Sequence, residues 1–456
     1  MLVIGGGVIG LTTAYALLLK DFEVTILDEA MDAASASKAT AGIIAGSTVV
    51  PWAKKGLWLQ LPKMFLSQNN PVSVSWPFPK NSLFFLSQSI KASHPLACAN
   101  SSLGLAQLGL NGYNAWQELL SDIPESRLFL KQNGCIFAYR TEDDYKADAH
   151  DLALRRDFGM VIDPLSSDDM QRIFPNLISR FAFGACVEKA GHVADIDGLL
   201  DTIKSTIIMH GGKFISTKVI GLCTAQDKIF SVVTKDHHHK ADIFLLGAGY
   251  GSSKLAQQIS FKVPIVPAWG ASVLFNDTNI KLAKPILVLR DGIAIAPSDS
   301  GLQVSGLLQI GEFCDGNTMR DRLIESARGL FGEFTYSQVE FTVGPRPLTA
   351  DSLPVIGVDP RYQNLYYNFG HGHWGIGQAS LSAKIISDLM IGTEGSAEIS
   401  AYSLGRFKTN CQVYQVDEWL ITVISKLDYS CNSKLMCAKS KYCGGPSAFC
   451  VPLLQK

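Results

Sequence analysis

The sequence predicts a protein of the α/β (α+β) class with two domains, and three observations support this prediction. A short apolar strand at residues 2–4 runs directly into a glycine-rich turn and a helix-compatible segment, which is how a parallel β-α-β unit begins. A second glycine-rich stretch, residues 368–377, precedes another helix-forming segment. Between them, residues 263–311 contain several strands separated by turn signals, which predict a sheet with hairpin connections.

Composition and charge exclude several classes of protein. The chain has 456 residues, of which 47% are hydrophobic and 18% charged, and its formal net charge is −1. This is enough apolar material for two cores, and the lack of a basic excess argues against a nucleic-acid partner. No apolar stretch is long enough for a membrane span. The N-terminus lacks the basic segment of a signal peptide, which favours a cytoplasmic location.

The turn after the first strand has the spacing G-x-G-x-x-G of a Rossmann-like dinucleotide-binding unit. Gly5 permits the tight turn, Gly7 lets the backbone approach a pyrophosphate, and Gly10 lets the helix pack closely on the strand. The helix then begins at Val8 and Ile9, whose N–H groups lie at the positive end of the helix dipole and suit phosphate binding.

The second strand, residues 23–27, ends at Asp28, where a carboxylate accepts the hydroxyls of a ribose. An acidic residue here disfavours a 2′-phosphate, which leaves FAD or NAD as the cofactor. Residues 33–42 are small and polar rather than a regular continuation of β-α alternation. They suit a loop close under a ligand and include Ala41 and Gly42.

The second glycine cluster includes Gly372 and Gly375 and leads into a helix predicted at 379–389. Its helix N-terminus offers further N–H groups to an anionic or electron-rich ring edge. Two such sites at opposite ends of the chain favour one extended cofactor, FAD.

At this point six segments carry a resemblance to a known family. They lie in order between residue 2 and about residue 408 and read VIGGGVIGLTTAYAL, VTILD, SKATAGII…PWAKKGL, ADIFLLGAGYGSSKLA, VGPRPLTADSLPVIG and NLYYNFGHGHWGIGQASLSAKIISDLMIG. The sequence resembles the D-amino-acid oxidase-like FAD-dependent oxidoreductase superfamily, and most closely its bacterial D-amino-acid dehydrogenases (small subunit).

The resemblance implies non-covalent FAD in a domain assembled from separated segments, beside a substrate domain with a mainly antiparallel sheet. On this basis the FAD-binding domain takes residues 1–60, 186–262 and 343–408, and the substrate-binding domain takes 61–185 and 263–342. The resemblance also implies that Val219 contacts the adenine through its backbone and that Gly247 belongs to the cofactor site.

The arginine of the segment VGPRPLTADSLPVIG is Arg346, which stands between two prolines. Proline restricts its own backbone and that of the preceding residue, so this arginine is held on stiff chain. In the resembled family the matching arginine holds the substrate carboxylate, which the guanidinium fork fits in a bidentate manner. The alternative from the residues alone is a buried ion pair with Asp351. His371, His373 and Tyr250 are candidates for further polar contacts with substrate.

The resemblance implies oxidative deamination of D-amino acids to 2-oxo acids and ammonia, by hydride transfer from Cα to flavin N5, with electrons passed to a quinone-type acceptor. Two alternatives stay open. One is an oxidase or dehydrogenase of a secondary amine or glycine-like substrate such as sarcosine, glycine or D-hydroxyproline. The other is a non-catalytic flavin subunit of a larger complex.

Residues 409–456 form a cysteine-rich tail beyond the resemblance. No pair of cysteines or histidines in the chain has zinc-finger spacing, so the sequence predicts no metal. One face of residues 418–427 is apolar at helical spacing. That face predicts docking on the protein itself, with a partner or peripheral contact on the inner face of the cell membrane as alternatives.

Three local patterns give further predictions. Residues 286–290 and 293–296 around Asp291-Gly292 predict a hairpin. Residues 229–234 and 243–246 predict another hairpin around a polar break. Residues 103–120 and 143–158 have helical patterns.

Overall fold

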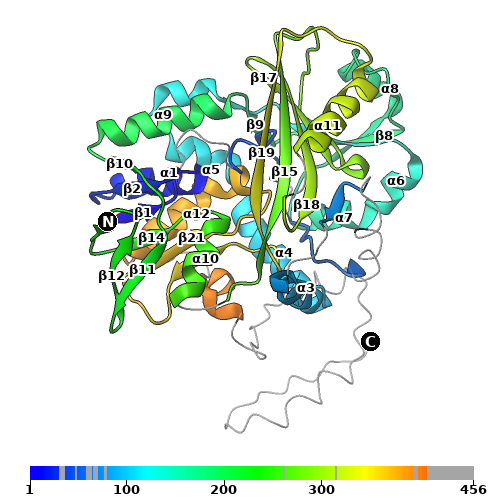
Figure 1. Ribbon diagram of the computed structural model, residues 1–456. Coiled ribbons are helices and arrows are strands. Elements are labelled where there is room, and N and C mark those ends of the chain that lie inside the picture. Colours follow the sequence, from blue (N-terminus) through cyan, green and yellow to red (C-terminus); the bar gives the residue numbers. More distant parts are fainter. Residues whose placement is uncertain are drawn as a thin grey trace, which may run out of the picture. The chain divides into compact units, whose positions relative to one another are not determined.

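A sheet of six strands forms from segments that lie far apart in the sequence. The computed structural model describes residues 1–29, 36–46, 49–57, 64, 70–75, 80–259, 262–313, 316–393 and 399–407. The strand order is β10-β2-β1-β14-β21-β20, and all neighbours are parallel except β20 and β21 (Figure 1). The strands are β1 (Leu2–Ile4), β2 (Thr25–Asp28), β10 (Lys213–Ser216), β14 (Phe244–Leu246), β20 (Val355–Val358) and β21 (Leu365–Phe369).

The alternation of side chains along these strands divides the interior into two cores. Val3 of β1 and Leu245 of β14 face a core shared with helices. Leu2 and Phe244, their neighbours along the chain, face a second core on the opposite side. Strands that are apolar on both faces are typical of a sheet covered on both sides.

Helices cover the first face in two layers. α1 (Val8–Leu18), α9 (Ile196–Met209) and α12 (Gly375–Met390) pack against the sheet, and α4 (Pro95–Gly109) and α5 (Gly112–Leu119) pack on α12. Trp116 of α5 is fully buried and donates a hydrogen bond from Nε1 to the carbonyl of Ile376, at 2.7 Å. The predicted domain division remains a proposal, and we amend it so that α4 and α5 belong with the FAD-binding domain.

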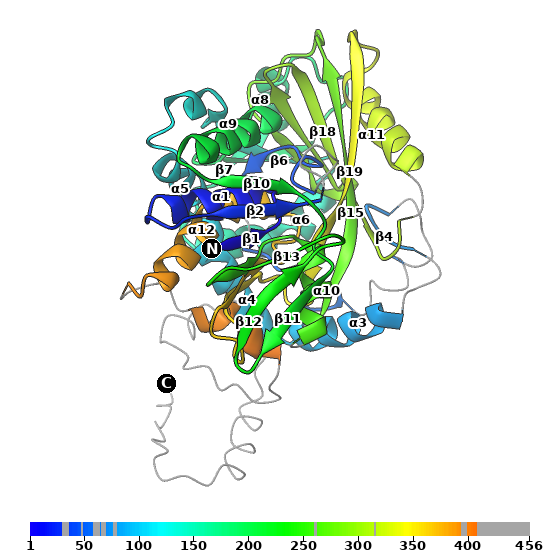
Figure 2. The ribbon, with the colours of Figure 1, turned by 60° about the vertical axis from the view of Figure 1, so that its left-hand side comes forward.

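The second face carries a small antiparallel sheet and one helix (Figure 2). The small sheet contains β11 (Gly221–Ala225), β12 (Lys228–Val233) and β13 (His238–His239), and the helix is α10 (Tyr250–Ile259). The predicted hairpin between residues 229–234 and 243–246 is wrong. β12 pairs with β11 and β13, whereas β14 joins the parallel sheet because its three residues are apolar on both faces.

A second large sheet has nine strands and is mainly antiparallel. Its order is β19-β15-β18-β17-β16-β6-β8-β7, with β4 beside β18, and only the pairs β16–β6 and β18–β4 are parallel among the described residues. Its strands are β4 (Val72–Val74), β6 (Cys135–Tyr139), β7 (Asp163–Ser166), β8 (Phe183–Val187), β15 (Ile265–Asn276), β16 (Ile286–Val288), β17 (Ile293–Ser298), β18 (Gly301–Ile310) and β19 (Gln338–Thr349). The predicted hairpin β16–β17 is confirmed, and Gly292 turns it with a φ of 63°.

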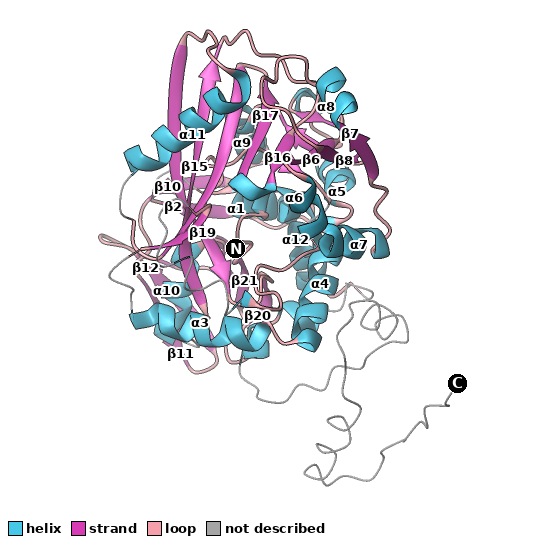
Figure 3. Cartoon of the chain, turned by 90° about the vertical axis from the view of Figure 1, so that its right-hand side faces the viewer, coloured by secondary structure: helices cyan, strands magenta, loops and turns pink. Residues whose placement is uncertain are grey.

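The long strands β15 and β19 lie side by side along twelve residues each (Figure 3). β19 is the edge strand, which is where a sheet tolerates prolines because no partner needs their missing N–H groups. Pro345 and Pro347 therefore fit this strand, and Arg346 between them pairs in register with Ala268. The helix α11 (Gly316–Phe331) packs its apolar side on β15 and β18.

The remaining elements connect these layers. The predicted helices at 103–120 and 143–158 each occur as two helices, the second pair being α6 (Glu142–Ala147) and α7 (Ala149–Asp157). The others are α3 (Lys80–Ala92), α8 (Ser167–Ile173), and a three-stranded sheet of β3 (Ile43–Ile44), β9 (Gly191–Val193) and β5 (Leu130–Lys131). Within the described chain, no helix is long and apolar enough to cross a membrane. The predicted helix of the tail lies outside the described residues.

Candidate active site

The first glycine turn packs tightly against the segment that follows β14. Gly5 has a φ of 111°, and a Cβ on it would lie 2.6 Å from the Cα of Ala248. A Cβ on Gly10 would lie 1.9 Å from the carbonyl oxygen of Gly5, and one on Gly247 would lie 3.4 Å from the Cα of Gly10. Close backbone packing therefore requires glycine at Gly5 and Gly10 before any ligand is considered.

Gly7 differs from these two because its surroundings are open. Among the described residues, a Cβ there would meet only the hydroxyl of Ser37, at 3.0 Å. The same hydroxyl accepts a hydrogen bond from the N–H of Val8 at 2.9 Å, and Asp28 Oδ2 accepts one from the N–H of Gly6 at 2.6 Å. An oxygen acceptor thus already lies at the N-terminus of α1, where a phosphate oxygen would bind.

The loop of residues 36–46 connects this turn to the second sheet. The carbonyl of Thr40 accepts hydrogen bonds from Gln303 Nε2 at 3.2 Å and from Ser272 Oγ at 3.4 Å. Gly42 has a φ of 68°, and a Cβ on it would lie 2.5 Å from the carbonyl oxygen of Val193. Ala41, between them, lines a cavity.

The second glycine cluster lies beside β19. The N–H of Gly372 donates to the carbonyl of Pro347 at 3.0 Å, and His371 forms an isolated bridge with Leu348. His371 is 2% exposed, and neither of its ring nitrogens has a partner among the described residues. Burial lowers the pKa of His371 to about 3. His373 is open to a cavity, and desolvation together with the nearby charge of Arg346 lowers its pKa below the ordinary value.

The loop of residues 36–46 and the second glycine cluster meet at a cavity of about 440 Å³, which is lined by Thr40 and Ala41 and by His373, Trp374 and Gly377. Strands β16, β17 and β18 also contribute to its wall. No residue of the first glycine turn lines this cavity. The helices that follow the two glycine-rich segments, α1 and α12, pack together in one core, so a single cofactor spanning both segments stays a proposal.

Arg346 also lines this cavity and is 9% exposed. Its Nη2 donates to the carbonyl of Ala39 at 2.8 Å and to Ser305 Oγ at 3.3 Å, and its Nη1 donates to the carbonyl of Leu307 at 3.4 Å. Burial lowers its pKa to about 10, so the guanidinium is still charged at neutral pH. All three acceptors are uncharged, and no carboxylate in the described chain pairs with it.

The alternative of a buried ion pair between Arg346 and Asp351 is wrong. Asp351 pairs with Arg406 instead, at 2.7 Å between Oδ2 and Nε. Arg346 rests on Gly270 of the neighbouring strand, because a Cβ there would lie 2.2 Å from its Cζ. The β15–β19 pair thus places a positive charge at the cavity wall with no opposite charge of its own.

A second basic group lines the cavity away from the glycine clusters. Arg155 of α7 and Lys54 are both lining residues. The guanidinium of Arg155 lies 4.7 Å from the centre of the Phe137 ring of β6. Arg155 does not stand out in the sequence, because helix 143–158 has no recognisable motif, whereas Lys54 belongs to the segment PWAKKGL that carries the resemblance.

Of the predicted site residues, Ala41, Arg346 and His373 line the cavity. The others do not line it, namely Gly5, Gly7, Val8, Ile9, Gly10, Asp28, Gly42, Val219, Gly247, Tyr250, His371, Gly372 and Gly375. Tyr250 begins α10 and, like Val219, packs against the core on the opposite face of the parallel sheet. His371 is adjacent to the cavity but does not line it, whereas His373 does. The sequence missed Gly270, although a glycine inside a strand is a signal for close backbone approach.

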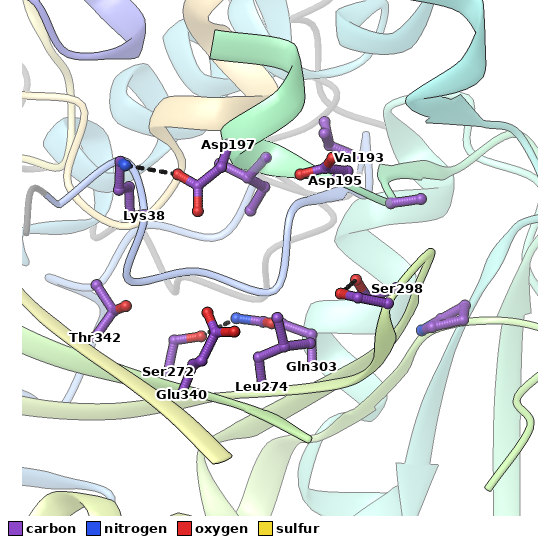
Figure 4. A pocket seen from close by; sticks show the side chains of 14 residues that line it. Lys38, Val193, Asp195, Asp197, Ser272, Leu274, Ser298, Gln303, Glu340 and Thr342 are labelled. Atoms are coloured by element: carbon purple, nitrogen blue, oxygen red, sulfur yellow. Dashed lines mark hydrogen bonds and ion pairs between the residues drawn. The ribbon is translucent and has the colours of Figure 1, made fainter. Parts of the chain in front are cut away.

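A smaller pocket of about 60 Å³ lies between the N-terminus of α9 and the second sheet (Figure 4). Lys38 pairs with Asp197 at 2.8 Å, Gln303 donates to Ser272, and Asp195 caps α9 through the N–H of Gly198 at 2.9 Å. These polar side chains satisfy one another, so the pocket is not a candidate active site.

The residues at the two glycine-rich segments fit FAD. Gly7 leaves the end of α1 open to a pyrophosphate. At the other end, the amide of Gln378 is fully buried near the start of α12 and, like His371, has no partner among the described residues. Buried polar groups normally have partners, so these unpaired groups indicate that a polar ligand completes them.

Known proteins support this fit. The model of the family DAO, FAD dependent oxidoreductase, matches residues 1–389. A D-amino-acid oxidase from Bradyrhizobium diazoefficiens is 23% identical over 416 residues, covering 89% of this chain and 98% of that protein. A glycine oxidase from Bacillus cereus has a TM-score of 0.67 at 19% identity, covering 88% of this chain and 97% of its own. An L-proline dehydrogenase from P. horikoshii has a TM-score of 0.66 at 16% identity, and the match covers 89% of this chain and 97% of that protein.

The family match extends over most of the chain, and the fold and the cofactor agree with it. The protein is an enzyme that catalyses FAD-dependent oxidoreduction of amines or amino acids. The chain belongs to the DAO family of FAD dependent oxidoreductases.

Proposed function

We propose that the protein oxidises D-amino acids to 2-oxo acids and ammonia, with Arg346 holding the substrate carboxylate. The observation that supports this most is the uncompensated charge of Arg346 at the cavity wall. A buried arginine costs free energy unless an anion balances it. A carboxylate matches its fork and would add charge-assisted hydrogen bonds.

FAD, when bound, accepts the electron pair of the substrate. The side chains of the protein bind the substrate and orient it. Arg346 fixes the carboxylate and hence the direction of the Cα substituents. Ile43, Phe137 and Ile293 line the cavity with apolar surface that excludes water.

His373 is neutral at neutral pH, because desolvation and the charge of Arg346 lower its pKa below the ordinary value. A neutral imidazole offers one N–H donor and one acceptor nitrogen. The titratable side chains that line the described cavity are Lys54, Arg155, Arg346 and His373. None of the four is placed to be a strong base, so we propose that the substrate enters with its amine already neutral.

The cofactor site in this proposal comprises both glycine clusters and their neighbours. It contains Gly5, Gly7, Val8, Ile9, Gly10, Asp28, Ala41, Gly42, Val219, Gly247, Gly372 and Gly375. His371 and Tyr250 remain proposed polar contacts, although Tyr250 packs away from the cavity wall.

The electron acceptor in the proposal is a quinone rather than oxygen, following the resemblance to D-amino-acid dehydrogenases. A secondary amine or glycine is the second candidate substrate. It is favoured by fold relatives whose names specify glycine and L-proline.

The test is anaerobic reduction of the bound flavin by a panel of amines. Both enantiomers of alanine, aspartate, asparagine and phenylalanine should be compared with glycine, sarcosine and proline. We expect the D-enantiomers to reduce the flavin fastest. Reduction by sarcosine or L-proline alone would support the second candidate, and reduction by none would support a non-catalytic flavin subunit. Reoxidation by a soluble quinone should exceed reoxidation by oxygen, and stoichiometric hydrogen peroxide at equal rate would contradict the proposed acceptor.

A further inference from the structure

The basic end of the cavity is built from one face of α7 and the strand beneath it. Asp148, Asp151 and Arg155 recur at helical spacing and lie on the same side of the helix. Arg155 is 7% exposed, and its Nη1 donates to Asp148 Oδ2 at 3.2 Å. This is its only hydrogen bond among the described residues, and its buried Nε has no partner.

The carboxylates of this cluster lie behind the cations. Lys54 pairs with Asp151 at 2.6 Å between Nζ and Oδ2. Asp148 Oδ2 accepts two hydrogen bonds, one from Arg155 and one from the hydroxyl of Tyr139 at 2.7 Å. Lys54 and Arg155 line the cavity, whereas neither aspartate does. A ligand in the cavity therefore meets the positive members of the cluster first.

Two strands separate this end from the position of Arg346. Arg346 donates to Ser305 of β18 and Arg155 lies on Phe137 of β6, and β17 and β16 lie between these strands in the sheet. From β17 and β16, the apolar side chains of Ile293 and Leu287 line the cavity. Phe137 supports the Arg155 guanidinium from below. Cations at separate wall positions with apolar lining between them suit a ligand with two anionic groups joined by methylenes.

We infer that Arg155 and Lys54 bind a second carboxylate, so that the substrates are acidic amino acids with a carboxylate in the side chain. This inference rests on the proposed function, in which Arg346 holds the first carboxylate. A side-chain carboxylate would accept hydrogen bonds from the guanidinium of Arg155 and from Lys54. A side-chain amide would bring no charge to either cation and offers a single acceptor oxygen in place of two.

The first experiment compares acid and amide substrates of equal length in the holoenzyme. D-aspartate should exceed D-asparagine, and D-glutamate should exceed D-glutamine, by at least about tenfold in the rate constant of flavin reduction divided by Kd. Arg155→Met should bring these ratios close to one, and Lys54→Met should reduce them in part. Arg156→Met is the matched control, because Arg156 is exposed on the same helix and does not line the cavity.

The second experiment measures binding without turnover. Succinate and butyrate differ by one carboxylate, and their affinities can be followed by calorimetry on the holoenzyme. We expect succinate to bind at least about tenfold tighter, with the difference lost in Arg155→Met. Arg346→Ala should weaken both ligands.

The outcomes separate the two proposals. Equal affinities for succinate and butyrate, with asparagine as good as aspartate, would overturn the inference and leave the proposed function standing. The protein could also prefer succinate in an Arg155-dependent manner while no D-amino acid reduces its flavin. That result would support the anion site and overturn the proposed function. If Arg155→Met loses its flavin or its circular dichroism, Lys54→Met and the wild-type ligand pairs still decide the question.

Discussion

Asp351 accepts two hydrogen bonds from Arg406, at 2.7 Å from Nε and 3.3 Å from Nη2, and so is not available to Arg346. Arg406 also donates to the carbonyls of Leu353 and Tyr402, at 2.7 Å each, and its side chain is 4% exposed. One buried arginine is thus fully engaged by the fold, and the other faces a cavity. Replacing them should have different consequences.

We expect Asp351→Ala to destabilise the protein by about 3–5 kcal/mol, because it leaves the buried charge of Arg406 without its partner. Chemical denaturation measures this loss. The affinity of folded protein for carboxylate ligands should be unchanged. A weakened succinate or butyrate affinity with unchanged stability would show that Asp351 acts on the substrate site.

Arg346→Ala should leave the flavin spectrum intact and remove on the order of 3–5 kcal/mol of transition-state binding, or roughly two to four decades in kcat/KM. Arg346→Lys should recover only part, since an ammonium restores the charge without the fork. Anaerobic flavin reduction by a D-amino acid measures both variants.

An amine that lacks the carboxylate is the control substrate for Arg346. It should be poor with the wild type and little affected by the alanine substitution. Near wild-type rate and affinity in Arg346→Ala would contradict the role of this arginine as the carboxylate group's binding partner.

Gly270→Ala should displace the Arg346 guanidinium, because the added Cβ would lie 2.2 Å from Cζ. A misplacement of this size should cost about ten- to a hundredfold in kcat/KM while FAD content stays normal. Gly329→Ala is the control. Its site on α11 is open, and the change should stabilise the helix by roughly 0.5–1 kcal/mol without altering activity.

Gly7→Val should yield a folded protein without FAD. Among the described residues the added Cβ would meet only the Ser37 hydroxyl, but the side chain would enter the space left for the pyrophosphate. Gly10→Ala should instead lose both fold and cofactor, because its Cβ would meet the carbonyl of Gly5. Circular dichroism and the flavin absorbance of purified protein distinguish the two results, and a yellow Gly7→Val protein at normal stoichiometry would contradict the assignment.

Stability should fall on acidification because of His371, which is 2% exposed. Its pKa in the folded protein is lowered to about 3, so below pH 6.5 the unfolded chain binds a proton that the folded chain does not. Its contribution is fully present above the unfolded pKa and decreases by roughly 2 kcal/mol between pH 7 and 5. His371→Gln should flatten the dependence of Tm on pH, whereas His150→Gln, at an exposed position, should not. Parallel curves for wild type and His371→Gln would refute this.

Local patterns predicted the elements whose partners are close in the sequence. The unit β1-α1-β2 follows from Gly5, Gly10 and Asp28, and the hairpin β16–β17 follows from Asp291-Gly292. The hairpin predicted for residues 229–246 was wrong because alternation shows that a segment is a strand but not which strand it pairs with. The break between α4 and α5 had a signal in Gly112, whose Cβ would lie 2.3 Å from the carbonyl of Gly377.

The residues of the site also fall into those that the sequence could predict and those that it could not. Arg346 could be predicted because its prolines and the resemblance both mark it. Its acceptors on Ala39, Ser305 and Leu307 could not, because three separated segments supply them through two main-chain carbonyls and one hydroxyl. Arg155 was missed because a buried arginine in an amphipathic helix has the same sequence appearance as an exposed one.

The contact between Gly270 and Arg346 also sets a rule for how this family changes over time. A side chain at position 270 and a guanidinium from position 346 would claim the same space, so the two positions cannot vary independently. A lineage that abandons the arginine frees position 270 to acquire alanine or serine, and a lineage that first acquires a side chain at 270 has already impaired its arginine. The order of substitution is therefore constrained, with loss of the arginine coming first.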